Sequence, residues 1–248
     1  MLTEKRHEII LKLLSEQQTI TIKDIIDATA VSETTIRRDL TDLEKQNRLE
    51  RIHGGATIAT RKLQEFSIRE KSTKNLQDKI NIAQAAASLV QKGDCIYLDA
   101  GTTTLQLIPF LKDKDVVVVT NGLTHTELLM KHEVTAYMTG GLIKDKTRAL
   151  IGSRAIQSLK NYRFDACFLG VNGFHKEAGY TTPDPEEAMM KQTAQQYAAS
   201  TYVLADHSKY NKVSFAKISE LQDAAIITSY IDESDLTSLQ RSTTVRSV

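Results

Sequence analysis

The segment Asp99–Thr104 (DAGTTT) combines residue types that suit the binding of an anion. It follows the apolar run CIYL, which predicts a buried strand, and it precedes a helical pattern. Backbone N–H groups at a helix N-terminus, together with three threonine hydroxyls, can hold a phosphate group. The spacing matches neither a Walker A loop nor a G-x-G-x-x-G motif, so a nucleotide cofactor is not indicated. Taken alone, the motif also fits a well-capped turn without a ligand.

Several other polar groups follow predicted strands further along the chain. In an open α/β sheet, ligands bind beyond the carboxyl ends of the strands, so these groups are candidates for the same site. They are Thr120, Asn121, the pair Gly140-Gly141, the run GVNG at 170–173, Asp184, Glu187, Lys191 and the run DHSK at 206–209, which ends at Lys209. Glu187 and Lys191 stand four residues apart on a predicted helix, where they could equally form an ion pair at the surface.

A different chemistry, contact with DNA, is predicted for the helix that begins near residue 33. Its residues Ile36, Leu40 and Leu43 have the i, i+4, i+7 spacing of a core-facing stripe. The side chains left on the outer face are those of Thr34, Thr35, Arg37, Arg38 and Thr41. Hydroxyl and guanidinium groups contact phosphates and base edges, and Arg pairs bidentately with guanine. A helical bundle with a solvated charged face is the alternative on these residues alone.

Two shorter helical patterns precede that helix and would position it. Thr3 can cap the first helix, and Thr21 begins the second. Ser32 is expected to cap the third helix, and Asn47 is expected to supply the left-handed residue that ends it.

Residues 48–56 alternate in polarity like a strand and then turn at a glycine pair. With Arg48, Arg51 and His53, this hairpin fits a wing that lies along the DNA backbone. Three helices and a hairpin together predict a small winged helix-turn-helix domain over residues 1–57.

The remainder of the chain predicts a larger α/β domain. Residues 58–78 are polar and basic but contain Phe66 and Ile68, so we interpret them as a linker that docks in part. From residue 79 to residue 248, continuous apolar strands alternate with helices, which is typical of a parallel sheet covered on both faces. The predicted strands are 95–98, 116–119, 134–138, 164–169, 201–204 and 225–228.

Composition narrows the functional classes only in part. The 32 basic residues nearly cancel the 31 acidic residues, so a nucleic-acid partner must be inferred from local placement. Cys95 and Cys167 suit buried positions, and no histidine has metal-ligand spacing, so no metal site is expected. No stretch reaches the roughly 20 apolar residues of a membrane span, and the start lacks a signal-peptide pattern, so we expect a cytoplasmic protein.

The run VSETTIRRDLTDLEKQNRLERIHGGA resembles the recognition helix and wing of the DeoR family of bacterial regulators. One departure is Asn47, where the family usually has glycine, although asparagine also tolerates the left-handed conformation. The resemblance implies double-stranded operator DNA as the partner of the first domain. The residues to which it assigns DNA contact are Ser32, Thr34, Thr35, Arg37, Arg38, Arg51 and His53.

The likeness continues through the second domain in the runs LDAGTTT, TN, GG, LGVNG, TTPDPEEAMMK and LADHSKY. It implies a sensor domain with a fold similar to ribose-5-phosphate isomerases, a sugar-phosphate effector and no cofactor. The residues implied around the phosphate are Gly101, Thr102, Thr103 and Thr104, with Lys209 as a second anion contact. The residues implied at the sugar end or in the switch are Asp99, Thr120, Asn121, Asp184, Glu187 and Lys191.

Together these expectations describe a repressor of a sugar-utilisation operon that a phosphosugar releases from DNA. Within the family the likeness is nearest to repressors of fructose operons, which suggests fructose 1-phosphate; phosphates of tagatose, galactitol, deoxyribose and glycerol stay open. A dimer or tetramer is expected, because two winged helices must match two operator half-sites.

Two other functions compete with this interpretation. A sugar-phosphate isomerase would need a carboxylate base, which Asp184 or Glu187 could supply. A fused winged helix gives an enzyme no obvious advantage, so no catalytic residue is expected. A module that responds only to a protein partner would favour exposed aromatic residues over polar strand ends.

Overall fold

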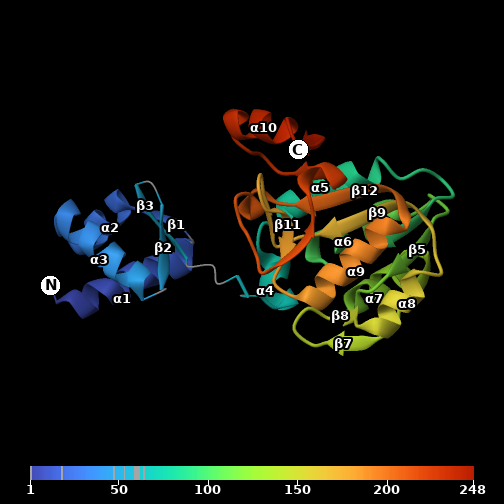
Figure 1. The fold of residues 1–248 in the computed structure, drawn as a ribbon, viewed down its shortest axis with the longest axis horizontal. Coiled ribbons are helices and arrows are strands. Elements are labelled where there is room, and N and C mark those ends of the chain that lie inside the picture. Colours follow the sequence, from blue (N-terminus) through green and yellow to red (C-terminus); the bar gives the residue numbers. More distant parts are fainter. Residues whose placement is uncertain (1, 18, 47, 53, 59–61, 64) are drawn as a thin grey trace. The chain divides into compact units, whose positions relative to one another are not determined.

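The structure, a computed structural model, describes the whole chain except residues 1, 18, 47, 53, 59–61 and 64 (Figure 1). The chain divides into two compact units, Met1–Arg61 and Lys62–Val248. Each unit has hydrophobic core residues of its own, so the two are described separately.

The first unit is a winged helix-turn-helix. Its helices are α1 (Thr3–Gln17), α2 (Ile22–Thr29) and α3 (Glu33–Lys45). Its strands are β1 (Thr19–Thr21), β2 (Leu49–Ile52) and β3 (Gly55–Ile58), which form an antiparallel sheet in the order β1-β3-β2. β1 lies outside the predicted strands, because three residues are too few to reveal the two-residue period of a strand.

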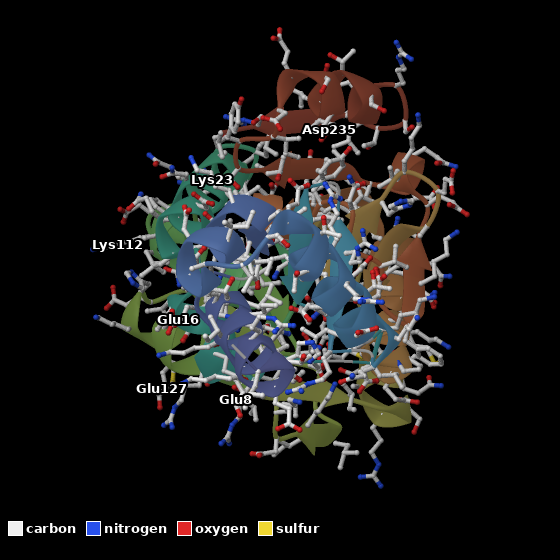
Figure 2. The ribbon with its side chains drawn as sticks, turned by 90° about the vertical axis from the view of Figure 1, so that its left-hand side faces the viewer. Glu8, Glu16, Lys23, Lys112, Glu127 and Asp235 are labelled. Carbon is white, nitrogen blue, oxygen red and sulfur yellow. The ribbon has the colours of Figure 1, made fainter. Side chains whose placement is uncertain are left out.

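Apolar side chains from all three helices form the core of this unit. They include Ile10 and Ile25 together with the predicted stripe of α3, and each is essentially inaccessible to solvent. Charged side chains on the outer faces, such as Glu8, Glu16 and Lys23, are exposed (Figure 2). The helical period of apolar residues therefore places the core correctly in this unit.

The helix ends follow the predicted caps in part. Thr21 caps α2 in a capping box with the acidic residue three positions on. Ser32 is the N-cap residue of α3, but its hydroxyl lies 3.0 Å from Thr35 Oγ1 instead of accepting from a backbone N–H. Thr3 is the first residue of α1 and not its cap. The left-handed residue expected at Asn47 lies outside the described residues.

The turn of the wing contains two glycines, and a side chain would be unfavourable at each of them. Gly54 has a φ of +80°, in the left-handed region that favours glycine. Gly55 lies against β1, where an added Cβ would stand 2.1 Å from the backbone oxygen of Ile20. The close approach of β1 thus explains the second glycine.

The second unit is built on a seven-stranded sheet whose described pairings are all parallel, in the order β15-β14-β12-β9-β4-β5-β6. The strands are β4 (Cys95–Leu98), β5 (Val117–Thr120), β6 (Thr135–Met138), β9 (Phe164–Gly170), β12 (Ala198–Ala205), β14 (Ala225–Thr228) and β15 (Val245–Ser247). The first six match the predicted strands closely. β15 is an additional edge strand, too short to stand out in the sequence.

Helices cover both faces of this sheet, as continuous apolar strands predict (Figure 1). One face packs against α5 (Leu76–Ala87), η1 (Ile108–Leu111) and α7 (Leu123–Lys131). The other face packs against α8 (Ser153–Leu159), α9 (Pro185–Gln196), η3 (Leu221–Asp223) and α10 (Glu233–Gln240). A small sheet of β10 (Gly173–His175), β11 (Gly179–Thr182) and β13 (Ala216–Ser219) extends that second face.

The remaining elements surround the carboxyl ends of the strands or connect them. They are α4 (Ile68–Thr73), α6 (Thr102–Leu105), the hairpin of β7 (Leu142–Lys144) and β8 (Ala149–Ile151), and η2 (His207–Lys209).

The segment 58–78 differs from the predicted linker. From Lys62 onwards it belongs to the second compact unit, and it contains α4 and the start of α5. Ser67 caps α4 in a capping box with Glu70, a signal that is present in the sequence as S-x-x-E. The expected anchors dock: Ile68 N donates to Lys146 O at 3.0 Å, and Phe66 is half-buried.

Candidate DNA interface and ligand site

The outer face of α3 carries the polar side chains that the sequence analysis assigned to DNA. Thr34, Arg37 and Arg38 are exposed, and Thr35 is half-buried. Ser32 is exposed at the start of the helix. This arrangement presents hydroxyl and guanidinium groups on one side of a helix that is held by its opposite, apolar side.

A buried ion pair fixes α3 to α1. Arg6 Nε and Nη2 donate to the two carboxylate oxygens of Asp39 at 2.7 and 2.9 Å, and His7 Nε2 lies 3.4 Å from Asp39 Oδ1. Both partners of the ion pair are at least nine-tenths buried. A bidentate pair of this kind restricts the rotation of a helix about its axis. Neither Arg6 nor Asp39 was predicted as a site residue, because a spacing of 33 residues carries no local signal.

Two arginines of this surface, Arg37 and Arg51, already have partners within the protein. Arg37 Nη2 lies 2.6 Å from Glu33 Oε1 one turn earlier in α3. Arg51 Nη1 donates to Thr41 Oγ1 at 2.8 Å, and Arg51 N donates to Glu44 Oε1 at 2.9 Å, so β2 is tied to α3. His53, the other predicted wing contact, lies outside the described residues.

In the second unit, Asp99 lies where the order of the strands reverses. β4 has β5 on one side and β9 on the other, and such a reversal is where open α/β sheets bind ligands. Asp99 Oδ2 accepts from Gly170 N at 3.1 Å and from Lys191 Nζ at 2.5 Å. The three groups therefore join the carboxyl ends of β4 and β9 to α9.

The turn after Asp99 is stabilised from within by Thr104. Its hydroxyl lies 2.6 Å from the backbone oxygen of Asp99, accepts from Gly101 N at 3.1 Å and lies 3.2 Å from His125 Nε2. Thr104 is completely buried, whereas the hydroxyls of Thr102 and Thr103 have no hydrogen bond within the described part of the chain. Of the three threonines, only Thr104 thus uses its hydroxyl in a described hydrogen bond within the turn.

Thr120 and Asn121 support that turn from β5. Asn121 Oδ1 accepts from Ala100 N at 2.8 Å, and its Nδ2 donates to Leu150 O at 3.2 Å. Thr120 Oγ1 accepts from Gly122 N at 3.0 Å. Both side chains are buried and their described polar contacts are internal, so their geometry suits positioning of the turn.

Lys144 joins a second group of carboxylates beside the first. Its Nζ lies 2.5 Å from Glu65 Oε2, 2.6 Å from Asp184 Oδ2 and 3.1 Å from Glu187 Oε1. Thr147 Oγ1 also donates to Glu187 Oε1, at 2.7 Å. Burial opposes the charge of Lys144, but the hydrogen bonds that its ammonium group donates to Asp184 and Glu65 outweigh burial and raise the pKa of the lysine.

Glu187 and Lys191 do not form an ion pair at the surface. Both side chains are buried, and each is hydrogen-bonded to a different partner, Glu187 to Lys144 and Lys191 to Asp99. Burial would raise the pKa of Glu187, but the charges of Lys191 and Lys144 outweigh it and hold that pKa below its ordinary value. The two ion clusters are therefore electrostatically connected through α9.

Two lysines whose side-chain amines have no described hydrogen bond or ion pair complete the surroundings. Lys71 of α4 is half-buried, and α4 packs against α6. Burial lowers the pKa of Lys71; Glu65 and Glu187 oppose that shift, while the charges of Lys209 and Lys191 add to it. The charges of Lys71 and Lys209 thus act on each other. Lys71 was not among the predicted site residues, because its segment had the composition of a linker.

Two family models match this chain. The DeoR-like helix-turn-helix domain matches residues 6–62, and the DeoR C terminal sensor domain matches residues 74–230. The chain belongs to the DeoR family. The resemblance noted in the sequence is thereby confirmed for both units.

Relatives of this DeoR-family chain include named regulators. It is 47% identical over 249 residues to the uncharacterized HTH-type transcriptional regulator FruR of Bacillus subtilis (strain 168), covering 100% of this chain and 99% of that one. It is 32% identical over 234 residues to the lactose phosphotransferase system repressor of Staphylococcus aureus (strain N315), covering 92% of this chain and 93% of that one.

Among solved structures, ribose 5-phosphate isomerase A from Methanocaldococcus jannaschii aligns with a TM-score of 0.42 and 19% identity, over 55% of each chain. Nothing about activity follows from the last likeness.

Two findings concern other classes of site in this DeoR-family chain. Within the described residues, no group of three or more His, Cys, Asp or Glu side chains is placed to hold a metal ion. None of the described helices has both the length and the apolar character needed to cross a membrane.

Proposed function

We propose that this DeoR-family regulator represses a sugar-utilisation operon and that a phosphosugar releases it from operator DNA. In this proposal residues 1–57 bind DNA and the second unit binds the effector in the cytoplasm. The proposed DNA contacts are Ser32, Thr34, Thr35, Arg37, Arg38, Arg51 and His53. The protein acts as a dimer or tetramer, so that two recognition helices reach two half-sites.

The observation that carries the effector class is the presence of two chemistries near the carboxyl ends of the strands. The hydroxyls of Thr102 and Thr103 have no described hydrogen bond, and with the amines of Lys71 and Lys209 they suit a phosphate. The carboxylates of Asp99, Asp184 and Glu187 suit sugar hydroxyls. The proposed ligand residues are Asp99, Gly101, Thr102, Thr103, Asp184, Glu187, Lys191, Lys209 and Lys71, with Thr104, Thr120 and Asn121 holding the turn.

Fructose 1-phosphate is the effector that we favour, on the resemblance of the sequence to fructose-operon repressors. The likeness to a regulator named FruR along the full chain supports this choice. Phosphates of tagatose, galactitol, deoxyribose and glycerol are the competing effectors.

We further propose that the sensor has no isomerase turnover. A general base needs a free carboxylate with a pKa near the working pH. Asp184 and Glu187 are instead bound to Lys144, and their pKa values are held below the ordinary range despite burial. Isomerisation of any pentose or hexose phosphate at enzyme-like rates would overturn this part.

The test is thermal unfolding of the intact protein with each phosphosugar, its unphosphorylated sugar and inorganic phosphate. A specific ligand at a hundred times its dissociation constant adds about 2.7 kcal/mol of stability, which raises the melting temperature. The same panel is then added to the complex with operator DNA, followed by fluorescence anisotropy. One phosphosugar that raises the melting temperature and releases the DNA supports the proposal. A panel without any such member contradicts the proposed effector class.

A further inference from the structure

The turn between β7 and β8 joins the candidate ligand site to the segment that leads to the first unit. Lys144 reaches Glu65, and Lys146 O accepts from Ile68 N at 3.0 Å. On its other side the same turn reaches α9, where Lys144 and Thr147 both bind Glu187 Oε1, at 3.1 and 2.7 Å. One short turn therefore contacts both the segment and the site.

Glu65 is the residue of this segment that belongs to the cluster of carboxylates around Lys144. Its side chain is more than nine-tenths buried, and its Oε2 lies 2.5 Å from Lys144 Nζ. Its other oxygen, Oε1, is buried with no hydrogen-bond partner among the described residues. A buried acceptor without a donor is costly, so such atoms call for an explanation by a ligand or a water.

The surroundings of Glu65 belong to the candidate ligand site. The charge of Glu65 acts on Lys71, which stands on the helix that packs against α6, and on Lys191, which holds Asp99. Asp184 and Glu187 share Lys144 with Glu65. Lys191 is already bound to Asp99, and Lys144 is shared with Asp184 and Glu187, so a hydroxyl group of a ligand is a donor that fits the remaining oxygen of Glu65.

We propose that Glu65 accepts a hydroxyl of the bound effector and, with Lys144, latches residues 65–68 to the ligand site. This inference rests on the proposed function and assigns its regulation to one residue of the segment that connects the units. Effector binding gives Glu65 an additional hydrogen-bond partner. This changes how strongly Lys144 interacts with each of its three carboxylates. The segment therefore shifts between two arrangements. The ligand acts only through its different affinity for those two arrangements.

The first arm of the test needs no effector. In full-length Glu65→Gln, hydrogen exchange of the Ile68 amide is expected to accelerate about tenfold, because the latch that holds this amide against Lys146 O is weakened. Amides of β9 serve as the internal reference, since a general loss of packing would accelerate them too. Asp145→Asn is the matched control: its carboxylate is adjacent to Lys144 in sequence but 90% exposed. Unchanged exchange at Ile68 in Glu65→Gln overturns the latch.

The second arm measures coupling. The probe is fructose 1-phosphate, or whichever phosphosugar of the panel raises the melting temperature of the unaltered protein. The ratio of operator affinities without and with this probe should fall about tenfold in Glu65→Gln and in Lys144→Met, and should recover in Lys144→Arg. Asp145→Asn should keep the ratio of the unaltered protein. A normal ratio in Glu65→Gln overturns the inference. Failure of every phosphosugar to release the unaltered protein would count against the proposed function, and the exchange arm would still decide the latch.

Discussion

Lys191 Nζ lies 2.5 Å from Asp99 Oδ2, and both side chains are almost completely buried. Burial would lower the pKa of Lys191, but Asp99 and Glu187 outweigh it and raise that pKa, so the lysine is charged. Removing one partner leaves the other as an uncompensated buried charge, which costs more than the pair contributes.

Lys191→Met is therefore expected to lower the free energy of unfolding by about 3 kcal/mol, because Asp99 would stay buried without its cation. Urea unfolding of the full chain measures the change. Lys112→Met removes an exposed lysine of the same unit and should change stability little. The double variant Asp99→Asn/Lys191→Met should lose less than the sum of the two single changes; additive losses would contradict a direct coupling.

Thr102→Val and Thr104→Val should separate ligand binding from stability. The hydroxyl of Thr102 has no described partner, so its loss should weaken binding of the effector about tenfold with little effect on unfolding. The hydroxyl of Thr104 bonds within the buried turn, so its loss should lower the free energy of unfolding by about 1–3 kcal/mol. Titration calorimetry and urea unfolding give the two quantities. Undiminished effector affinity in Thr102→Val would remove this residue from the phosphate site.

The buried side chain of His125 is expected to make the stability of the second unit sensitive to acid. Burial lowers its pKa from 6.5 to about 4, against the opposing effect of the Asp99 backbone oxygen. Between these values the unfolded chain binds a proton that the native state does not. The stability is therefore fully present above pH 6.5 and is lost as the pH falls towards 4, by up to about 3 kcal/mol.

The check is urea unfolding at several pH values between 7 and about 4.5. His125→Asn should flatten the dependence on pH whatever its effect on absolute stability, because the titrating group is gone. His132→Asn, at the opposite end of α7 and half-buried, should keep the slope of the unaltered protein. An unchanged slope in His125→Asn would show that other groups govern the acid sensitivity.

Arg37 is expected to exchange its partner on binding DNA. In the free protein it pairs with Glu33, an exposed contact that contributes little stability. Arg37→Ala should weaken operator binding by about 1–3 kcal/mol if the guanidinium reads a base. Lys12→Ala, an exposed change on α1, is the control for altered net charge. Anisotropy titrations against operator and scrambled DNA distinguish the cases: an equal loss on both sequences would assign Arg37 to phosphate contact.

Local signals in the sequence determined most of the architecture. The i, i+4, i+7 stripe of α3, the glycine pair of the wing and the continuous apolar strands each depend on neighbours within a few residues, so their period or composition is visible directly. The same holds for Asp99 and for Glu187 and Lys191, which were found because they stand at strand ends or share a helix turn. The segment 58–78 is an exception. The capping box of Ser67 and Glu70 indicated a helix, but the polar and basic composition led to the prediction of a linker.

Only the tertiary structure decided how these polar groups are paired. Lys191 reaches Asp99 across 92 residues, Lys144 gathers carboxylates from the segment before α4 and from the start of α9, and Arg6 holds Asp39 across 33 residues. It also separated Thr104, whose hydroxyl is used within its turn, from Thr102. A charged side chain can pair with any opposite charge that the fold brings near, and its position in the sequence carries no period that names the partner. Burial then decides which of those pairs must form, because an unpaired charge inside the protein costs far more than one in water.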